Sequence, residues 1–326
     1  MITVEHLTKC YGDFVAVDDL SFEIGEGHVY GFLGPNGAGK STTMNIMTGC
    51  LSATAGHVRI DGHDIFDEPN QAKALIGYLP EQPPLYMNET PTEYLRFVGE
   101  AKGLRGEELT RQIESVMEQT KIQDMRNRCI NALSKGYKQR VGIAQALLGN
   151  PKVIILDEPT VGLDPIQIIE IRDLIRQLGQ SHTVILSSHI LSEVQTMCEK
   201  ILIIAKGKLI AFDAPENLER RLLAPSEITL TTEADEQTAQ EILAGVDGIT
   251  ETKFSAGPDS LLTIHLRTDA HDIYHLSKAL FFAFAQKNTA LLEMALKKAN
   301  LEDIFLELTE SSEESKSSAE AKGAKS

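Results

Sequence analysis

The chain has 326 residues, enough for about two domains, and 42% of them are hydrophobic, as is usual for a globular protein with a buried core. It carries 47 Asp and Glu against 31 Lys and Arg, which disfavours broad nucleic-acid binding because that needs excess positive charge. We find no signal-peptide pattern and no apolar run long enough to span a membrane, so we expect any membrane role to come through a partner. The 4 cysteines form no CxxC pair, which favours reduced thiols in the cytoplasm.

The first two thirds of the chain are predicted to alternate strands and helices. Apolar runs broken by glycines predict strands at 2–7, 21–24, 28–33, 56–62 and 75–79, with a helix at about 40–48. Helical spacing predicts an inserted helical lobe at about 89–135, with helices near 92–102 and 107–120, and a further helix at 141–148. The continuous apolar run 153–156 is typical of a strand covered on both faces. Helices at 166–178 and 190–198 and strands at 183–187, 201–204 and 208–211 complete this unit.

A second unit is predicted after Pro215. Strands at 227–232, 251–255, 261–266 and 290–296 alternate with helices at 236–243 and 273–286, and a closing helix follows at 301–308. The order strand-helix-strand-strand-helix-strand suggests a small ferredoxin-like α+β domain over residues 216–310. The polar segment 311–326 is rich in Ser, Glu and Lys and is predicted to be a disordered tail.

A glycine-rich segment joins the strand at 28–33 to the helix that follows it. It reads Gly34-Pro35-Asn36-Gly37-Ala38-Gly39-Lys40-Ser41, with Thr42 next, and it fits the P-loop pattern. The glycines let successive backbone N–H groups point at one spot, and the N-terminus of the helix adds its dipole there. Such a loop binds a phosphate chain. Lys40 would reach the β- and γ-phosphates, and the Ser41 hydroxyl would bind a magnesium ion.

Two acids end the apolar strand at 153–156. Asp157 and Glu158 stand in the Walker B arrangement. Asp157 can hold the magnesium ion, directly or through water, and Glu158 can polarise the water that attacks the γ-phosphate. An Asp-Glu pair after a strand is usually a solvated turn, but a P-loop in the same chain makes the catalytic interpretation the stronger one.

A third motif, Leu133-Ser-Lys-Gly-Tyr-Lys-Gln-Arg140, lies just before a predicted helix. It resembles the signature motif of ABC ATPases, commonly Leu-Ser-Gly-Gly-Gln, with Lys135 and Tyr137 at two of the motif's positions. The groups expected to contact phosphate, Ser134 and the backbone of Gly136, are retained. Alone the stretch would indicate an N-cap serine. Between a P-loop and a Walker B strand, it is the mark of the ABC family.

Further marks of that family follow in its usual order over residues 11–189. Tyr11 is similar to the aromatic residue on which adenine stacks. Asp164 lies in a segment that resembles the D-loop, which reaches the other nucleotide-binding subunit. His189 resembles the switch histidine that bonds the γ-phosphate.

The Q-loop departs from the family pattern. Where a glutamine usually senses magnesium and the attacking water, this chain has Glu81, with Gln82 next to it. A carboxylate and an amide both offer an oxygen acceptor. The sequence therefore leaves open which of the two residues fills the role.

The resemblance implies an α/β fold of the P-loop NTPase type over residues 1–215, with a helical lobe and an antiparallel β subdomain. It also implies a head-to-tail dimer, with a second copy or a homologue. Two Mg-ATP would lie between the P-loop of one subunit and Ser134 and Gly136 of the other.

Within the family, the chain resembles the ATP-binding subunits of ABC-2 type exporters in its added α+β domain and in the segments 78–81 and 300–309. The residues of its signature motif resemble those of the gliding-motility and copper-processing members of that group. The chain would then hydrolyse ATP on the cytoplasmic face of the membrane and drive export through a separate permease.

A soluble ABC ATPase acting on ribosomes or DNA is the alternative. The single cassette, the lack of a long coiled coil and the acidic balance disfavour it. A non-hydrolysing ATP switch is a third interpretation, disfavoured by Glu158.

Overall fold

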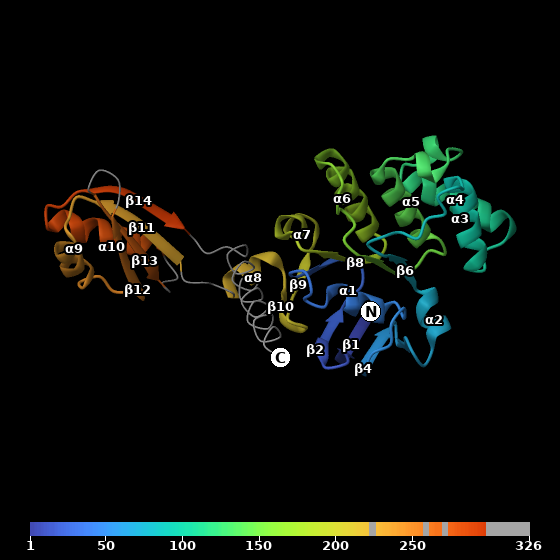
Figure 1. The fold of residues 1–326 in the computed structure, drawn as a ribbon, viewed down its shortest axis with the longest axis horizontal. Helices are drawn as coiled ribbons and strands as arrows, with labels where there is room; N and C mark the ends of the chain where they lie inside the picture. The colour runs from blue at the N-terminus through green and yellow to red at the C-terminus, as the bar shows by residue number, and fades with distance from the viewer. Residues whose placement is uncertain (222–225, 257–260, 269–272, 298–326) are drawn as a thin grey trace, which may run out of the picture. The chain divides into compact units, whose positions relative to one another are not determined.

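A computed structural model describes residues 1–221, 226–256, 261–268 and 273–297. The chain divides after Pro215 into two compact units, which are described separately below (Figure 1). The closing helix predicted at 301–308 and the tail predicted from residue 311 lie outside the described residues.

The first unit is organised around a six-stranded sheet with the strand order β10-β9-β3-β8-β7-β6. Five strands are parallel, and the edge strand β10 (Lys208–Asp213) pairs antiparallel with β9. The parallel strands are β3 (Val29–Leu33), β6 (Ile76–Leu79), β7 (Val153–Leu156), β8 (Thr183–Ser188) and β9 (Lys200–Ala205). Every residue of β3, β7 and β8 is buried, as expected for strands with both faces covered.

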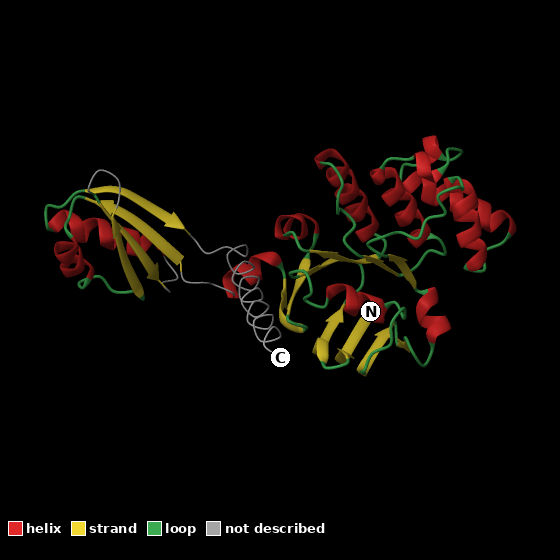
Figure 2. Cartoon of the chain, viewed as in Figure 1, coloured by secondary structure: helices red, strands yellow, loops and turns green. Residues whose placement is uncertain are grey.

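A second, antiparallel sheet of the same unit has the order β2-β1-β4-β5. It consists of β1 (Ile2–Tyr11), β2 (Phe14–Ile24), β4 (Ala55–Ile60) and β5 (His63–Asp64). Figure 2 shows α1 (Lys40–Met47) between the two sheets, with α6 (Pro165–Gly179) and α7 (Leu191–Met197) on the opposite face of the parallel sheet. Side chains from both sheets and from α1 form one hydrophobic core, which holds the start of α1 in place.

Helices complete the first unit. They are α2 (Pro69–Ala74), α3 (Pro91–Ala101), α4 (Gly106–Gln119), α5 (Lys135–Leu147), α6 (Pro165–Gly179) and α7 (Leu191–Met197), with 3-10 turns at Gln123–Met125 and Ile130–Ala132. The helical lobe is present, and α3 begins with a capping box between Thr90 and Glu93. The predicted start of α5 near residue 141 was wrong, since the helix begins at Lys135. Its first turn is polar, and the N-cap is the Ser134 side chain, which accepts from the Tyr137 N–H.

The second unit has the predicted order of strands and helices. Its strands β11 (Ser226–Thr232), β12 (Glu251–Ala256), β13 (Leu262–Thr268) and β14 (Leu291–Lys297) form an antiparallel sheet in the order β12-β13-β11-β14. The helices are α9 (Glu236–Leu243) and α10 (Ile273–Gln286), after a short α8 (Pro215–Arg221). This is the ferredoxin-like topology. Its core is separate from that of the first unit and packs β11 and β13 against α9 and α10.

We expect the two cores to respond independently to cavity-forming substitutions. Ile155 on β7 and Leu266 on β13 are both 0% exposed. Ile155→Ala and Leu266→Ala should each lower the free energy of unfolding of their own unit by about 2–5 kcal/mol. Hydrogen exchange, read by mass spectrometry on peptides from each unit, measures both effects. Each variant is the control for the other, and equal loss of protection in both units would contradict the prediction.

Candidate functional site

The segment between β3 and α1 forms a tight backbone loop around the side chain of Lys40. Gly37 and Gly39 have φ values of 82° and 102°, in the left-handed region that favours glycine. A Cβ atom at Gly39 would lie 2.6 Å from the carbonyl oxygen of Ala16, so a larger residue would not fit. The Lys40 ammonium crosses the loop and donates to the carbonyl oxygens of Gly34 at 2.8 Å and Pro35 at 3.3 Å. The loop and the start of α1 therefore present a compact positive site to an anion.

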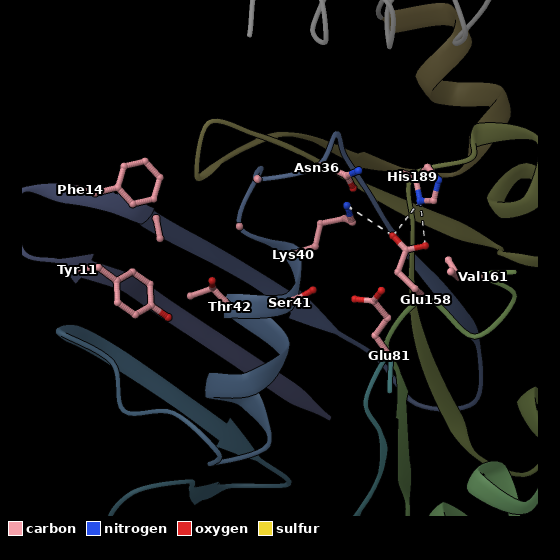
Figure 3. Close-up of a pocket in the computed structure, with 13 residues that line it drawn as sticks. Tyr11, Phe14, Asn36, Lys40, Ser41, Thr42, Glu81, Glu158, Val161 and His189 are labelled. Carbon is pink, nitrogen blue, oxygen red and sulfur yellow. Dashed lines mark hydrogen bonds and ion pairs between the residues drawn. The ribbon is translucent and has the colours of Figure 1, made fainter. Parts of the chain in front are cut away.

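A cavity of about 400 Å³ opens over this loop (Figure 3). Residues of the antiparallel sheet, of the P-loop and of the loops after β6, β7 and β8 line it. The lining residues are Tyr11, Phe14, Ala16, Asn36, Gly37, Gly39, Lys40, Ser41, Thr42, Glu81, Glu158, Val161 and His189. The structure thus brings most of the predicted nucleotide-site residues of one chain into a single pocket.

Lys40 lies among acids inside this pocket. Its Nζ is 3.7 Å from Oε1 of Glu158, and only 6% of its side chain is exposed. Burial lowers the pKa of Lys40, while the charges of Glu158, Asp157 and Glu81 work against that change. A poorly hydrated ammonium attracts a phosphate strongly, because less water must be removed when the two meet.

Ser41 and Asp157 face one another at the base of the pocket. The Ser41 hydroxyl is 3.3 Å from Oδ1 of Asp157, and the Ser187 hydroxyl donates to the same oxygen at 2.6 Å. Hydroxyl and carboxylate oxygens are ligands that Mg²⁺ accepts, and this ion usually keeps substrate phosphates and waters as its remaining ligands. Within the described ranges no group of three or more His, Cys, Asp or Glu side chains is placed to hold a metal. The facing oxygens of Ser41 and Asp157 fit a magnesium ion that also binds substrate phosphates and waters.

Glu158 and His189 form a close pair at the edge of the pocket. Nδ1 of His189 is 3.0 Å from Oε2 and 3.1 Å from Oε1 of Glu158 (Figure 3). Glu158 has a φ of 48°, a left-handed conformation that costs a non-glycine residue about 1–3 kcal/mol. Its backbone N–H donates to the Ser187 hydroxyl at 2.7 Å, which helps to hold that conformation. The carboxylate is thereby held next to both Lys40 and His189.

Two aromatic residues border the outer end of the pocket. Tyr11 and Phe14 are 49% and 63% exposed, at the turn between β1 and β2. The Lys9 ammonium lies 5.2 Å from the centre of the Tyr11 ring. Exposed rings beside a phosphate site offer a stacking surface for a base.

The signature and D-loop residues lie outside this pocket. Ser134 caps α5, and Asp164 caps α6 by accepting from the Gln167 N–H at 2.9 Å. Gly136 is buried against the side chain of Gln167, where a Cβ would come within 2.7 Å. None of the three lines the cavity that Lys40 and Glu158 share.

The structure distinguishes the two Q-loop candidates by position. Glu81 lines the pocket, and Figure 3 shows its carboxylate near Glu158 and Ser41. Both residues are exposed, but Gln82 is not among the lining residues. Of the two candidates, Glu81 is therefore the one that lies at the pocket.

Sequence reasoning missed the hydroxyls that support the loops carrying Glu158 and His189. Ser187 bonds both Asp157 and the Glu158 backbone, and Thr160 donates to the buried carboxylate of Glu193 at 2.6 Å. The signal that could have identified these hydroxyls is the pairing of β7 with β8. Because β7 and β8 are parallel neighbours, with Leu156 opposite Leu186, the residues that follow Leu156 lie next to Ser187 at the end of β8.

The described part of the chain contains no helix long and apolar enough to cross a membrane.

A strand-loop-helix phosphate site with a lysine, a serine and two acids at the ends of parallel strands defines a nucleotide-binding P-loop protein. Residues 17–161 match the family model described as ABC transporter. The chain is 32% identical over 315 residues to the linearmycin resistance ATP-binding protein LnrL of Bacillus subtilis, covering 95% of this chain and 98% of that protein. It is 39% identical to the bacitracin transport ATP-binding protein BcrA of Bacillus licheniformis, covering 68% and 72%.

A solved structure has the same fold. It is a dimeric post-hydrolysis state of the ATP-binding cassette MJ0796 bound to ADP and Pi, with a TM-score of 0.60, 28% identity, and 66% of this chain and 98% of that chain covered. The chain belongs to the family of ABC transporter ATP-binding proteins. It binds nucleotide and is an ATPase, as the sequence predicted.

We expect the Q-loop function to depend on Glu81 rather than on Gln82. Glu81→Ala should reduce ATP turnover by about a hundredfold, the range of a lost proton acceptor or water-orienting group. Glu81→Gln should retain much more turnover, because the amide keeps one oxygen acceptor. Phosphate release under saturating ATP measures both. Gln82→Ala is the matched control, and a larger loss in that variant would assign the function to Gln82.

Proposed function

We propose that two copies of this chain, or one copy and a homologue, close head to tail around two Mg-ATP and so drive export through a separate membrane permease. The observation that carries the dimer is the separation of the two half-sites. Lys40 and Glu158 share one pocket, while Ser134 and Gly136 of the same chain lie outside it. A second subunit would bring its own Ser134 and Gly136 to the open side of the bound nucleotide.

The residues then have the following roles. The loop Gly34–Thr42 and Lys40 hold the phosphates, Tyr11 stacks on adenine, and Asp164 contacts the other subunit. Ser41, Asp157 and Glu81 would hold a magnesium ion, which would offset phosphate charge. Glu158 accepts the proton of the attacking water, and His189, 3.0 Å away, contacts the γ-phosphate. Hydrolysis removes the charge that bridges the subunits, and the dimer reopens.

A cluster of exposed apolar side chains on α3 and on the segment before it supports a membrane partner. Tyr86 and Phe97 are each 50% exposed, their ring centres are 5.1 Å apart, and Met87 beside them is 45% exposed. The segment that carries Tyr86 follows Glu81 by five residues. A permease helix packed on these rings would be coupled through this short segment to the nucleotide pocket. We place the chain accordingly on the cytoplasmic face of the membrane.

The names of the relatives indicate a class of cargo. LnrL is named for linearmycin resistance and BcrA for bacitracin transport. We propose that this chain likewise powers the export of an antibiotic-type compound, with the cargo contacts made by the permease.

Glu158→Gln should trap the proposed dimer. The amide keeps the shape of the carboxylate but cannot accept a proton, so ATP should bind and turnover should fall by about two to four orders of magnitude. Light scattering should detect a dimer with ATP and Mg²⁺ and a monomer when EDTA replaces Mg²⁺. The double variant Lys40→Ala/Glu158→Gln is the control and should stay monomeric. Full turnover in Glu158→Gln would remove Glu158 from the proton-accepting role.

The same variant tests the membrane partner. Tagged Glu158→Gln protein recovered from detergent-solubilised membranes with Mg-ATP should carry a multi-spanning protein at near-equal stoichiometry. Replacing Tyr86 and Phe97 together by Ser should lose that protein and leave nucleotide binding unchanged. Recovery of only ribosomal or soluble proteins would favour the soluble-ATPase alternative instead.

A further inference from the structure

A buried carboxylate outside the nucleotide pocket connects the two loops that carry Glu158 and His189. Glu193 lies on α7, and only 3% of its surface is exposed. Its Oε2 accepts from the Thr160 hydroxyl at 2.6 Å and lies 3.5 Å from the Ser188 hydroxyl. Thr160 follows Glu158 by two residues, and Ser188 directly precedes His189. One side chain is therefore bonded to both catalytic loops.

A third element contacts the same carboxylate. Nη2 of Arg172 on α6 is 3.4 Å from Oε1 of Glu193, so both carboxylate oxygens have partners. Nε of Arg172 is buried and has no hydrogen-bond partner among the described residues. The Arg172 side chain as a whole is 22% exposed, and a single buried donor left unpaired calls for an explanation, because buried polar groups are normally hydrogen-bonded. Since α6 begins directly after Asp164, the ion pair ties the D-loop helix to the two catalytic loops.

The backbone around Glu158 needs such support. Its left-handed φ of 48° persists only if neighbouring contacts fix it on both sides. On one side the Glu158 N–H is bonded to Ser187. On the other, Val161 N–H donates to the Glu158 carbonyl at 3.2 Å, and Thr160 within that same turn is held by Glu193.

From these contacts we infer that Glu193 is a positioning residue for hydrolysis. It fixes the loop after β7 relative to the loop after β8, and so sets the distance between Glu158 and His189 without touching nucleotide. The inference rests on the proposed role of Glu158 as proton acceptor. Small displacements of a catalytic group reduce turnover steeply, by about a hundredfold for 1 Å, while phosphate binding by the P-loop is unaffected.

The test separates positioning from simple destabilisation. Glu193→Ala should lower the turnover number by about a hundredfold and leave the affinity for a fluorescent ATP analogue within about twofold. Glu193→Gln, which can still accept from Thr160, should lose less. Thr160→Val should reproduce the loss, and Thr160→Ser should restore turnover. This second pair tests the same bond should Glu193→Ala not fold.

A buried carboxylate elsewhere in the first unit provides the matched control. Asp64 is 7% exposed and is bonded to His57 and to backbone N–H groups away from the pocket. Asp64→Asn should lower thermal stability but not turnover of the folded protein. If it lowers turnover as much as Glu193→Ala does, the positioning role is overturned.

The decisive measurement is a double-mutant cycle under single-turnover conditions. In the Glu158→Gln background, Glu193→Ala should have no further effect, because the group that it positions is already inactive. An undiminished further loss in that background would overturn the inference and leave the role of Glu158 standing. Full turnover in Glu158→Gln alone would instead overturn the proposed function on which the inference rests.

Discussion

The nucleotide site depends on the parallel pairing of three neighbouring strands. β3, β8 and β7 lie side by side, with Leu33 opposite Ser188 and Leu156 opposite Leu186. Because parallel strands end at the same edge of a sheet, the P-loop, the two acids Asp157 and Glu158, and His189 all start from that edge. Lys40 and Glu158 are 118 positions apart in the chain (158 − 40) and yet come within 3.7 Å. Because these strands are covered on both faces of the sheet, they have little freedom to shift relative to one another.

The local charge distribution explains why a positive loop works in an acidic protein. The chain has a formal net charge of −16, and the pocket itself contains Glu81 and Glu158. The loop N–H groups and the Lys40 ammonium provide the attraction for phosphate at short range, where solvent screens little. The acids Glu81 and Glu158, by contrast, repel the negative charge of a phosphate. A triphosphate placed beside them needs a cation, which the facing oxygens of Ser41 and Asp157 are suited to bind.

The two unusual residues of the signature motif each have a contact within the chain. The Tyr137 hydroxyl lies 3.0 Å from the Asp124 carboxylate, and this hydrogen bond raises the pKa of Tyr137. It ties the first turn of α5 to the 3-10 turn of the helical lobe. The Lys135 ammonium lies beside Gly162, where a side chain would collide with it. The start of α5 is thus joined to the helical lobe on one side and to the D-loop segment on the other.

Much of this protein could be predicted from its sequence because local rules decide it. The P-loop glycines, the apolar strand before Asp157 and the N-cap Ser134 each express a backbone or burial preference within a few residues. The family resemblance added the order of the motifs, and the alternation of strands and helices indicated both units. Short or polar elements were missed or misplaced, such as α2 and the first turn of α5, since they lack a hydrophobic period.

Only the tertiary structure decided which side chains meet. The sequence placed Glu81 and Gln82 side by side with equivalent chemistry, and the path of the chain after β6 put Glu81 at the pocket. Likewise Ser187, Thr160 and Glu193 carry no motif of their own. Their importance comes from the parallel packing of β7 and β8, which brings distant loops within hydrogen-bond distance. Local sequence sets the conformation of each loop, but contact between loops depends on strand order and register, which are properties of the folded sheet.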